Sequence, residues 1–197
     1  MGRDLRVIDP DYPYHAGSNG NNRGPLVLDH TDCEIFCEEL NRVATKYEWK
    51  VFSWCLMTTH DHVILQTTKE AFSAGFQELN GNHSRRTNAR HDRRDHTFRH
   101  RPYAEAIVSD AHMVAAILYD ARNPLAAGIV RNAAAWPYGS YRAIMGLEPA
   151  PRWLAVEEVL RLFGRDMAEA RRMFASVVHA GQVLVSNTGV DGAGVAA

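Results

Sequence analysis

The chain has 197 residues, of which 46% are hydrophobic and 23% charged, and its formal net charge at pH 7 is -1. These values are typical of one compact globular domain with a short appendage. No apolar run approaches the length of a membrane-spanning helix, and the first residues lack the apolar stretch of a signal peptide. The three cysteines form neither a zinc-pair nor a disulfide pattern, so a cytoplasmic location is expected.

Turn residues and hydrophobic periodicity predict strands that alternate with helices in the first half of the chain. A strand is expected at residues 12–16. Thr31 and Glu34 have the spacing of a capping box, which predicts the start of a helix over 32–47. Two further strands are expected at 50–57 and 62–67, joined by a short turn.

A second helix is predicted to begin near residue 70 and to run into an arginine-rich loop at 85–101. Residues 102–108 favour a strand, and Asp110 is expected to cap a helix that Pro124 ends or kinks. The order β-α-β-β-α-β-α indicates an α+β sandwich, with the helices on one face of a small antiparallel sheet.

A first domain is predicted over residues 12–147, and the pattern of the sequence after it is helical without strand signals. Helical periodicity at 156–163, and again after the capping residue Asp166, predicts a C-terminal helical extension over 148–185. The tail at 186–197 is rich in Gly, Val and Ala without periodicity, so it is expected to be disordered.

His60 and His62 are two residues apart inside a predicted strand, where alternate side chains point the same way. Two adjacent imidazoles provide half of a metal site, although such a pair can also be purely structural. Asp61, between them, should point to the opposite face, into what is normally core.

Tyr119 and Asn123 are four residues apart and therefore share one face of a helix. A tyrosine hydroxyl beside an amide oxygen could place a nucleophile and a metal ligand on one surface. The alternative is a tyrosine that anchors the end of the helix and an asparagine that caps it before the proline.

Seven arginines gather between residues 85 and 101, against only two aspartates, although the net charge of the whole chain is -1. Aromatic residues lie nearby, and this mixture suits a phosphate backbone with stacked bases. A solvated, mobile loop is the alternative interpretation. The arginines are Arg85, Arg86, Arg90, Arg93, Arg94, Arg99 and Arg101.

Five motifs in one order resemble the single-tyrosine HUH transposases. Residues 55–65 resemble the family pattern CLMPNHxHLL, residues 79–103 the pattern LNGxxxRxxNRRHxRxGHLFxxRF, and residues 119–130 the pattern YIxxNPVRAGLV. Residues 136–141 resemble WPWSSY, and the C-terminal helices resemble the family's WL…LLxxFG helices. The resemblance is to IS200-like transposases, in particular the REP-associated tyrosine transposases, and covers roughly residues 12–181.

The resemblance implies a ferredoxin-like sandwich with a central antiparallel sheet. It also implies that His60, His62 and Asn123 bind Mg²⁺ or Mn²⁺ and that Tyr119 is the nucleophile. The implied activity is that of a single-stranded or hairpin DNA endonuclease and strand transferase that forms a 5′-phosphotyrosine, with the seven arginines binding DNA. The resemblance is compatible with a monomer or a homodimer. It implies no membrane partner.

Other functions stay open. The chain departs from the family pattern at Asp61, at Thr58–Thr59 in place of Pro-Asn, and at residues 18–21 in place of SRGN. These departures fit a domesticated, non-catalytic DNA-binding protein with the same fold. A metal-dependent hydrolase of small phosphoesters is a third function. A zinc deaminase is excluded, because the chain lacks a His-x-Glu followed by Pro-Cys-x-x-Cys.

Overall fold

A four-stranded antiparallel sheet forms the centre of the molecule, with the strand order β2-β3-β1-β4. The computed structural model describes residues 8–186, with side chains through residue 180. All but the first residue of the tail predicted at 186–197 therefore lies outside the described part. The strands are β1 (Tyr14–Gly17), β2 (Lys50–Leu56), β3 (Asp61–Gln66) and β4 (Tyr103–Ala106).

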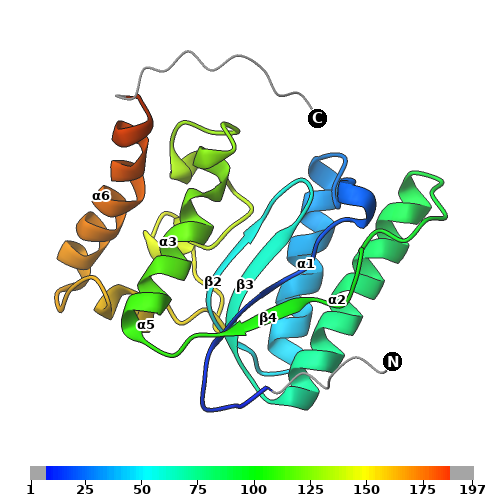
Figure 1. Cartoon of the computed structure of the whole chain (residues 1–197), viewed down its shortest axis with the longest axis horizontal. Helices are drawn as coiled ribbons and strands as arrows, with labels where there is room; N and C mark the ends of the chain where they lie inside the picture. Colours follow the sequence, from blue (N-terminus) through cyan, green and yellow to red (C-terminus); the bar gives the residue numbers. More distant parts are fainter. Residues whose placement is uncertain (1–7, 187–197) are drawn as a thin grey trace.

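Helices cover both faces of this sheet. As Figure 1 shows, α1 (His30–Lys46) and α2 (Lys69–Arg90) lie side by side on one face, and α3 (Asp110–Ala126) lies on the other. The remaining helical elements are η1 (Asn21–Arg23), η2 (Ala133–Ala135), α4 (Tyr141–Ile144), α5 (Val156–Arg161) and α6 (Met167–Ser186). The element order and the sheet confirm the predicted ferredoxin-like α+β class. The predicted layer of helices on one face consists of α1 and α2, and α3 additionally covers the opposite face.

The core between the sheet and α2 depends on a close contact at a glycine. The ring of Trp49 packs against Phe76 with centroids 5.0 Å apart, and its Nε1 donates to the carbonyl of Ala71 at 3.2 Å. A Cβ at Gly75 would come within 2.3 Å of that ring. The glycine inside α2 thus lets the tryptophan lie flat against the helix.

Two helix starts differ from the prediction by one or two residues. α1 is capped by Asp29, whose carboxylate accepts from the backbone N–H of Asp32, and not by Thr31. α3 is capped by Ser109 and not by Asp110. In both cases the residue with extended backbone dihedrals provides the cap, since that conformation aims its side chain at the free N–H groups of the first turn.

Of the two effects predicted for Pro124, ending or kinking the helix, the structure excludes the first, since Pro124 lies inside α3. The helix continues to Ala126, because a proline in the last turn keeps a helical φ and removes only one hydrogen bond. The true end is Gly128 at φ +69°, whose N–H donates to Leu125 O, while Ile129 N–H donates to Pro124 O. These two bonds form a Schellman motif.

The C-terminal extension completes the sheet edge at β2. The N–H of Val51 donates to Trp153 O at 2.9 Å, and the N–H of Ala155 donates to Val51 O at 2.8 Å. This pairing covers an otherwise open strand edge. Asp166 caps α6 as predicted, accepting from Glu169 N–H at 2.8 Å. No helix in the described part is long and apolar enough to cross a membrane.

Candidate functional site

The two predicted histidines lie at the start of β3 with their rings together. A tight turn, in which Met57 N–H donates to His60 O at 2.8 Å, joins β2 to β3. The ring centroids of His60 and His62 are 4.9 Å apart. The strand alternation that predicted a shared direction therefore yields two adjacent imidazoles.

Asp61 points away from the histidines, as strand alternation predicts. Its side chain is fully buried, and Oδ2 accepts from the backbone N–H of Ser18 at 3.2 Å. Burial raises the pKa of Asp61 to about 7, although the hydrogen bonds to Ser18 oppose that shift. Asn80 of α2 donates to the Ser18 hydroxyl, so Asp61 belongs to the polar contacts on the α2 face of the sheet.

His62 is the most deeply buried of the histidines at this site. Burial, followed by the charges of His15 and His60, lowers its pKa to about 3, so the ring is neutral at physiological pH. Its Nδ1 lies 2.6 Å from the hydroxyl of Tyr103, while Nε2 is buried without a hydrogen-bond partner. When Nδ1 donates to the Tyr103 hydroxyl, Nε2 carries the lone pair that a metal ion would need.

Tyr119 extends from α3 to the same place. Its side chain is 52% exposed, and its ring meets the ring of His62 edge-on with centroids 5.2 Å apart. Asn123 follows one turn later on α3, and its Nδ2 is buried without a partner. Solvent can therefore reach the tyrosine, whereas the amide nitrogen of Asn123 is buried without a hydrogen bond.

Three residues near the histidines were not found from the sequence. Tyr103 from β4 holds His62, and His15 from β1 stacks against it with centroids 5.2 Å apart. Asp120, next to Tyr119, is fully buried on α3, and burial raises its pKa. For Asp120 the sequence holds one signal that could have identified it: it is a charged residue within the apolar stripe of a predicted helix.

The residues fit a divalent cation. Imidazole nitrogens and an amide oxygen are ordinary metal ligands, and the free Nε2 of His62 is an orphaned buried atom of the kind that a cation would satisfy. A separate cluster of possible metal ligands, Asp29, Asp32 and His91, lies on the side of α1 and α2. Arg90 already binds both aspartates of this cluster.

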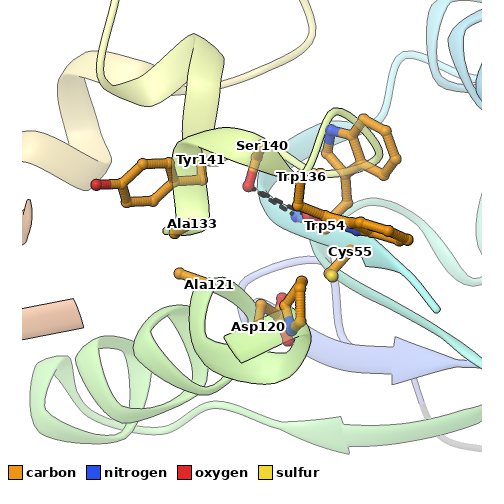
Figure 2. Close-up of a pocket in the computed structure, with 10 residues that line it drawn as sticks. Trp54, Cys55, Asp120, Ala121, Ala133, Trp136, Ser140 and Tyr141 are labelled. Atoms are coloured by element: carbon orange, nitrogen blue, oxygen red, sulfur yellow. Dashed lines mark hydrogen bonds between the residues drawn. The ribbon is translucent and has the colours of Figure 1, made fainter. Parts of the chain in front are cut away.

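A small cavity lies beside Asp120, between α3 and the aromatic turn at residues 136–141 (Figure 2). Its volume is about 10 Å³, roughly the space of one water-sized sphere. Trp136 Nε1 donates to Leu56 O, and Ser140 accepts from Trp54 N–H at 3.1 Å. The aromatic turn therefore holds β2 in place and is too closely packed to admit a substrate.

The predicted arginine loop is partly helical. Arg85, Arg86 and Arg90 lie on α2, where Arg85 donates to Asn82 and the other two form ion pairs with carboxylates. Arg86 binds Glu38 at 2.7 Å and Glu39 at 3.0 Å, and Arg90 binds the aspartates before and inside α1. Among the described residues no carboxylate pairs with Arg85, Arg93, Arg94, Arg99 or Arg101.

The loop that carries the last arginines is fastened beside His60. Asn19 and Gly20 form β-bridges with His60 and Phe98 respectively. The N–H of Arg99 donates to Asn19 O at 2.8 Å. Through residues 19 and 20, the arginine loop and the histidine turn are thus held next to each other.

Comparison with known proteins agrees with this architecture. The family model described as transposase IS200 like matches residues 11–117, more than half of the chain. The match contains both histidines and all seven arginines, and it ends two residues before Tyr119.

One similar solved structure is that of a REP-associated tyrosine transposase bound to a REP hairpin. It is 18% identical, its TM-score is 0.62, and the alignment covers 76% of this chain and 89% of that one. No curated protein matches the chain. The extent of the family match settles the assignment: the chain belongs to the IS200-like transposases.

Proposed function

We propose that the protein is an endonuclease and strand transferase for single-stranded or hairpin DNA, with Tyr119 as its nucleophile. The observation that carries the proposal is the contact between the exposed ring of Tyr119 and the buried ring of His62. A tyrosine that solvent can reach, beside the neutral imidazole of His62, is arranged for attack on a phosphodiester.

The cation of the proposed site is Mg²⁺ or Mn²⁺, held by His60, His62 and Asn123. When bound, it supplies positive charge for the oxygens of the scissile phosphate. Tyr103 holds the orientation of the His62 ring, because its hydroxyl lies 2.6 Å from Nδ1 and can accept a hydrogen bond from it.

The reaction exchanges one phosphoester bond for another. The Tyr119 oxygen forms a bond to phosphorus, the bond from phosphorus to the 3′ oxygen breaks, and the phenolic proton ends on that oxygen. A 5′-phosphotyrosine and a free 3′-hydroxyl remain. Because the phosphoester energy is kept, the 3′-hydroxyl of a second strand can reseal the DNA without ATP.

The unpaired arginines support DNA as the substrate. Arg93, Arg94, Arg99 and Arg101 extend from the loop that is tied to His60, so a strand bound along them would pass the histidines. The solved transposase of similar fold was bound to a DNA hairpin, which makes a hairpin the first substrate to test.

The test is a covalent adduct. Labelled hairpin DNA is incubated with the protein and Mn²⁺ and separated on a denaturing gel. We expect a protein–DNA band that disappears in Tyr119→Phe and persists in Tyr12→Phe, which changes another exposed tyrosine. Salt-sensitive DNA binding without an adduct on any single-stranded substrate would refute strand transfer and leave a non-catalytic DNA-binding protein.

A further inference from the structure

A second group of metal-ligating side chains lies just inside the proposed catalytic site. It takes one residue from each of three elements: His15 from β1, His62 from β3 and Asp120 from α3. One ligand atom of each lies within 4.8 Å of those of the other two. The side chains of His15 and Asp120 are 14% and 0% exposed, so bulk water does not solvate this group.

Several polar atoms of this group are buried and lack a well-formed hydrogen bond. His15 Nε2 lies 3.2 Å from Asp120 Oδ1, within ion-pair distance, and Ser53 also interacts with this carboxylate. His15 Nε2, His62 Nε2 and both Asp120 oxygens are buried and unsatisfied. Buried polar atoms with unmet hydrogen bonds are costly, and a cation among these four would interact favourably with all of them.

Neighbouring rings hold the two imidazoles in place. Tyr103 binds Nδ1 of His62, which leaves Nε2 for the cluster. The His15 ring packs edge-on against Tyr103 and Tyr119, with centroid distances of 5.8 and 6.0 Å. The donor atoms are thus fixed by packing, as in metal sites whose ligands are oriented before the metal binds.

We propose that His15, His62 and Asp120 bind a four-coordinate transition-metal ion, Zn²⁺, with the fourth position open to water. Two imidazoles and one carboxylate are typical zinc ligands, whereas Mg²⁺ prefers six oxygens. The donor atoms of a tetrahedral zinc site lie roughly 3.3 Å apart when the bonds are about 2.0 Å long. The ligand atoms here lie within 4.8 Å of one another, so small side-chain movements would bring them to that spacing.

This inner site shares His62 with the proposed catalytic site, so one cation at a time can use its Nε2. Zn²⁺ in the inner site would therefore exclude Mn²⁺ from His62. The binding itself does not rest on the proposed strand transfer, because it needs neither DNA nor Tyr119.

The experiment measures metal binding by the full chain after removal of metals with a chelator. Co²⁺ is titrated and followed by the visible absorption of four-coordinate cobalt, and Zn²⁺ is then added to displace it. We expect one Co²⁺ per chain, displaced by Zn²⁺ and also bound in Tyr119→Phe. His15→Phe, which keeps an aromatic ring, and Asp120→Asn should lower the affinity at least tenfold.

His60→Ala is the matched control, since it removes a histidine at the catalytic site and leaves the inner group intact. Unchanged cobalt absorption in this variant supports the inner site. Loss of binding in His60→Ala, retention in a folded His15→Phe, or no Co²⁺ bound by the wild type would each overturn the proposal. If Asp120→Asn does not fold, as judged by circular dichroism, His15→Phe alone decides. The covalent-adduct assay with Mn²⁺ tests the catalytic proposal separately.

Discussion

At the scale of single residues, the burial of His62 decides what the site can do. A neutral imidazole with a pKa of about 3 keeps its ligand nitrogen unprotonated far below neutral pH. Tyr103 is the residue that fixes this ring, and burial raises the pKa of Tyr103, so its hydroxyl stays protonated. In the proposed metal site, the pair would therefore act as one ligand with a fixed direction.

Replacing Tyr103 with phenylalanine removes the contact that orients His62. We expect Tyr103→Phe to weaken Mn²⁺ binding about 10- to 100-fold, the usual cost of losing such a supporting group. Free Mn²⁺ is measured by electron paramagnetic resonance, with Tyr12→Phe as control. Equal affinity in Tyr103→Phe and the wild type would show that the hydroxyl does not position the ring.

At the scale of elements, the arginine segment divides into two parts with different partners. Arg86 and Arg90 join α2 to α1 through ion pairs, whereas Arg99 and Arg101 lie in the loop beyond the helix. The helical arginines therefore contribute to packing between helices, and the loop arginines are the ones available to phosphates.

The double variant Arg99→Ala/Arg101→Ala should bind single-stranded hairpin loops more weakly. The plot of log K against log salt should become shallower. Its negative slope should decrease in magnitude by roughly 1 to 1.5, because each contact with a single strand contributes about 0.7. Fluorescence anisotropy at several salt concentrations measures this slope. Arg152→Ala is the control, since Arg152 adjoins the Lys50 end of β2, opposite the end that pairs with Asp61. An unchanged slope would remove these two arginines from the DNA interface.

The contact between α1 and α2 predicts an acid sensitivity. Lys46, Tyr47 and Arg42 converge on Glu78 and lower its pKa to about 2, with hydrogen bonds as the main cause. A carboxyl whose folded pKa is lowered contributes stability above its unfolded pKa of about 4.5, and this is lost as the pH falls toward 2.

Glu78→Gln should therefore be less stable than the wild type at pH 7, by about 1 kcal/mol or less, since the group is near the surface. The difference should shrink steadily between about pH 5 and pH 2. Urea unfolding at several pH values measures it. A difference that is independent of pH would mean that the charge on Glu78 adds nothing to the contact.

At the scale of the whole molecule, the C-terminal extension shares a core with the domain that carries the site. Phe174 of α6 is fully buried against Tyr141 and Phe163. Arg122 of α3 donates to the carbonyls of Val177 and Val178. Because α3 also carries Tyr119, the packing of α6 supports the helix on which the proposed nucleophile lies.

Phe174→Ala should lower the free energy of unfolding by about 3–5 kcal/mol, the usual cost of a cavity left by a buried phenylalanine. The neighbouring Met173→Ala is the control, because Met173 is 48% exposed and its loss should change the stability by less than about 0.5 kcal/mol. Denaturant unfolding measures both. Similar values for the two variants would argue that the extension is not packed on the domain.

The sequence by itself determined those features that follow from local periodicity. Strand alternation predicted that His60 and His62 share a direction and that Asp61 points to the other face, and the structure agrees. The order of strands and helices gave the fold class, and the order of five motifs indicated the family. The roles of His60, His62, Asn123 and Tyr119 remain proposals.

Only the tertiary structure decided which residues from distant elements meet. His15 and Asp120 come from different elements, and they join His62 because α3 packs on the face of the sheet formed by β2 and β3, next to β1. The pairing of Arg86 with Glu39 likewise depends on how α1 lies against α2. Periodicity fixes the face of an element on which a side chain lies. Which residue it meets across that face is set by the packing of elements against one another, and this packing leaves no local pattern in the sequence.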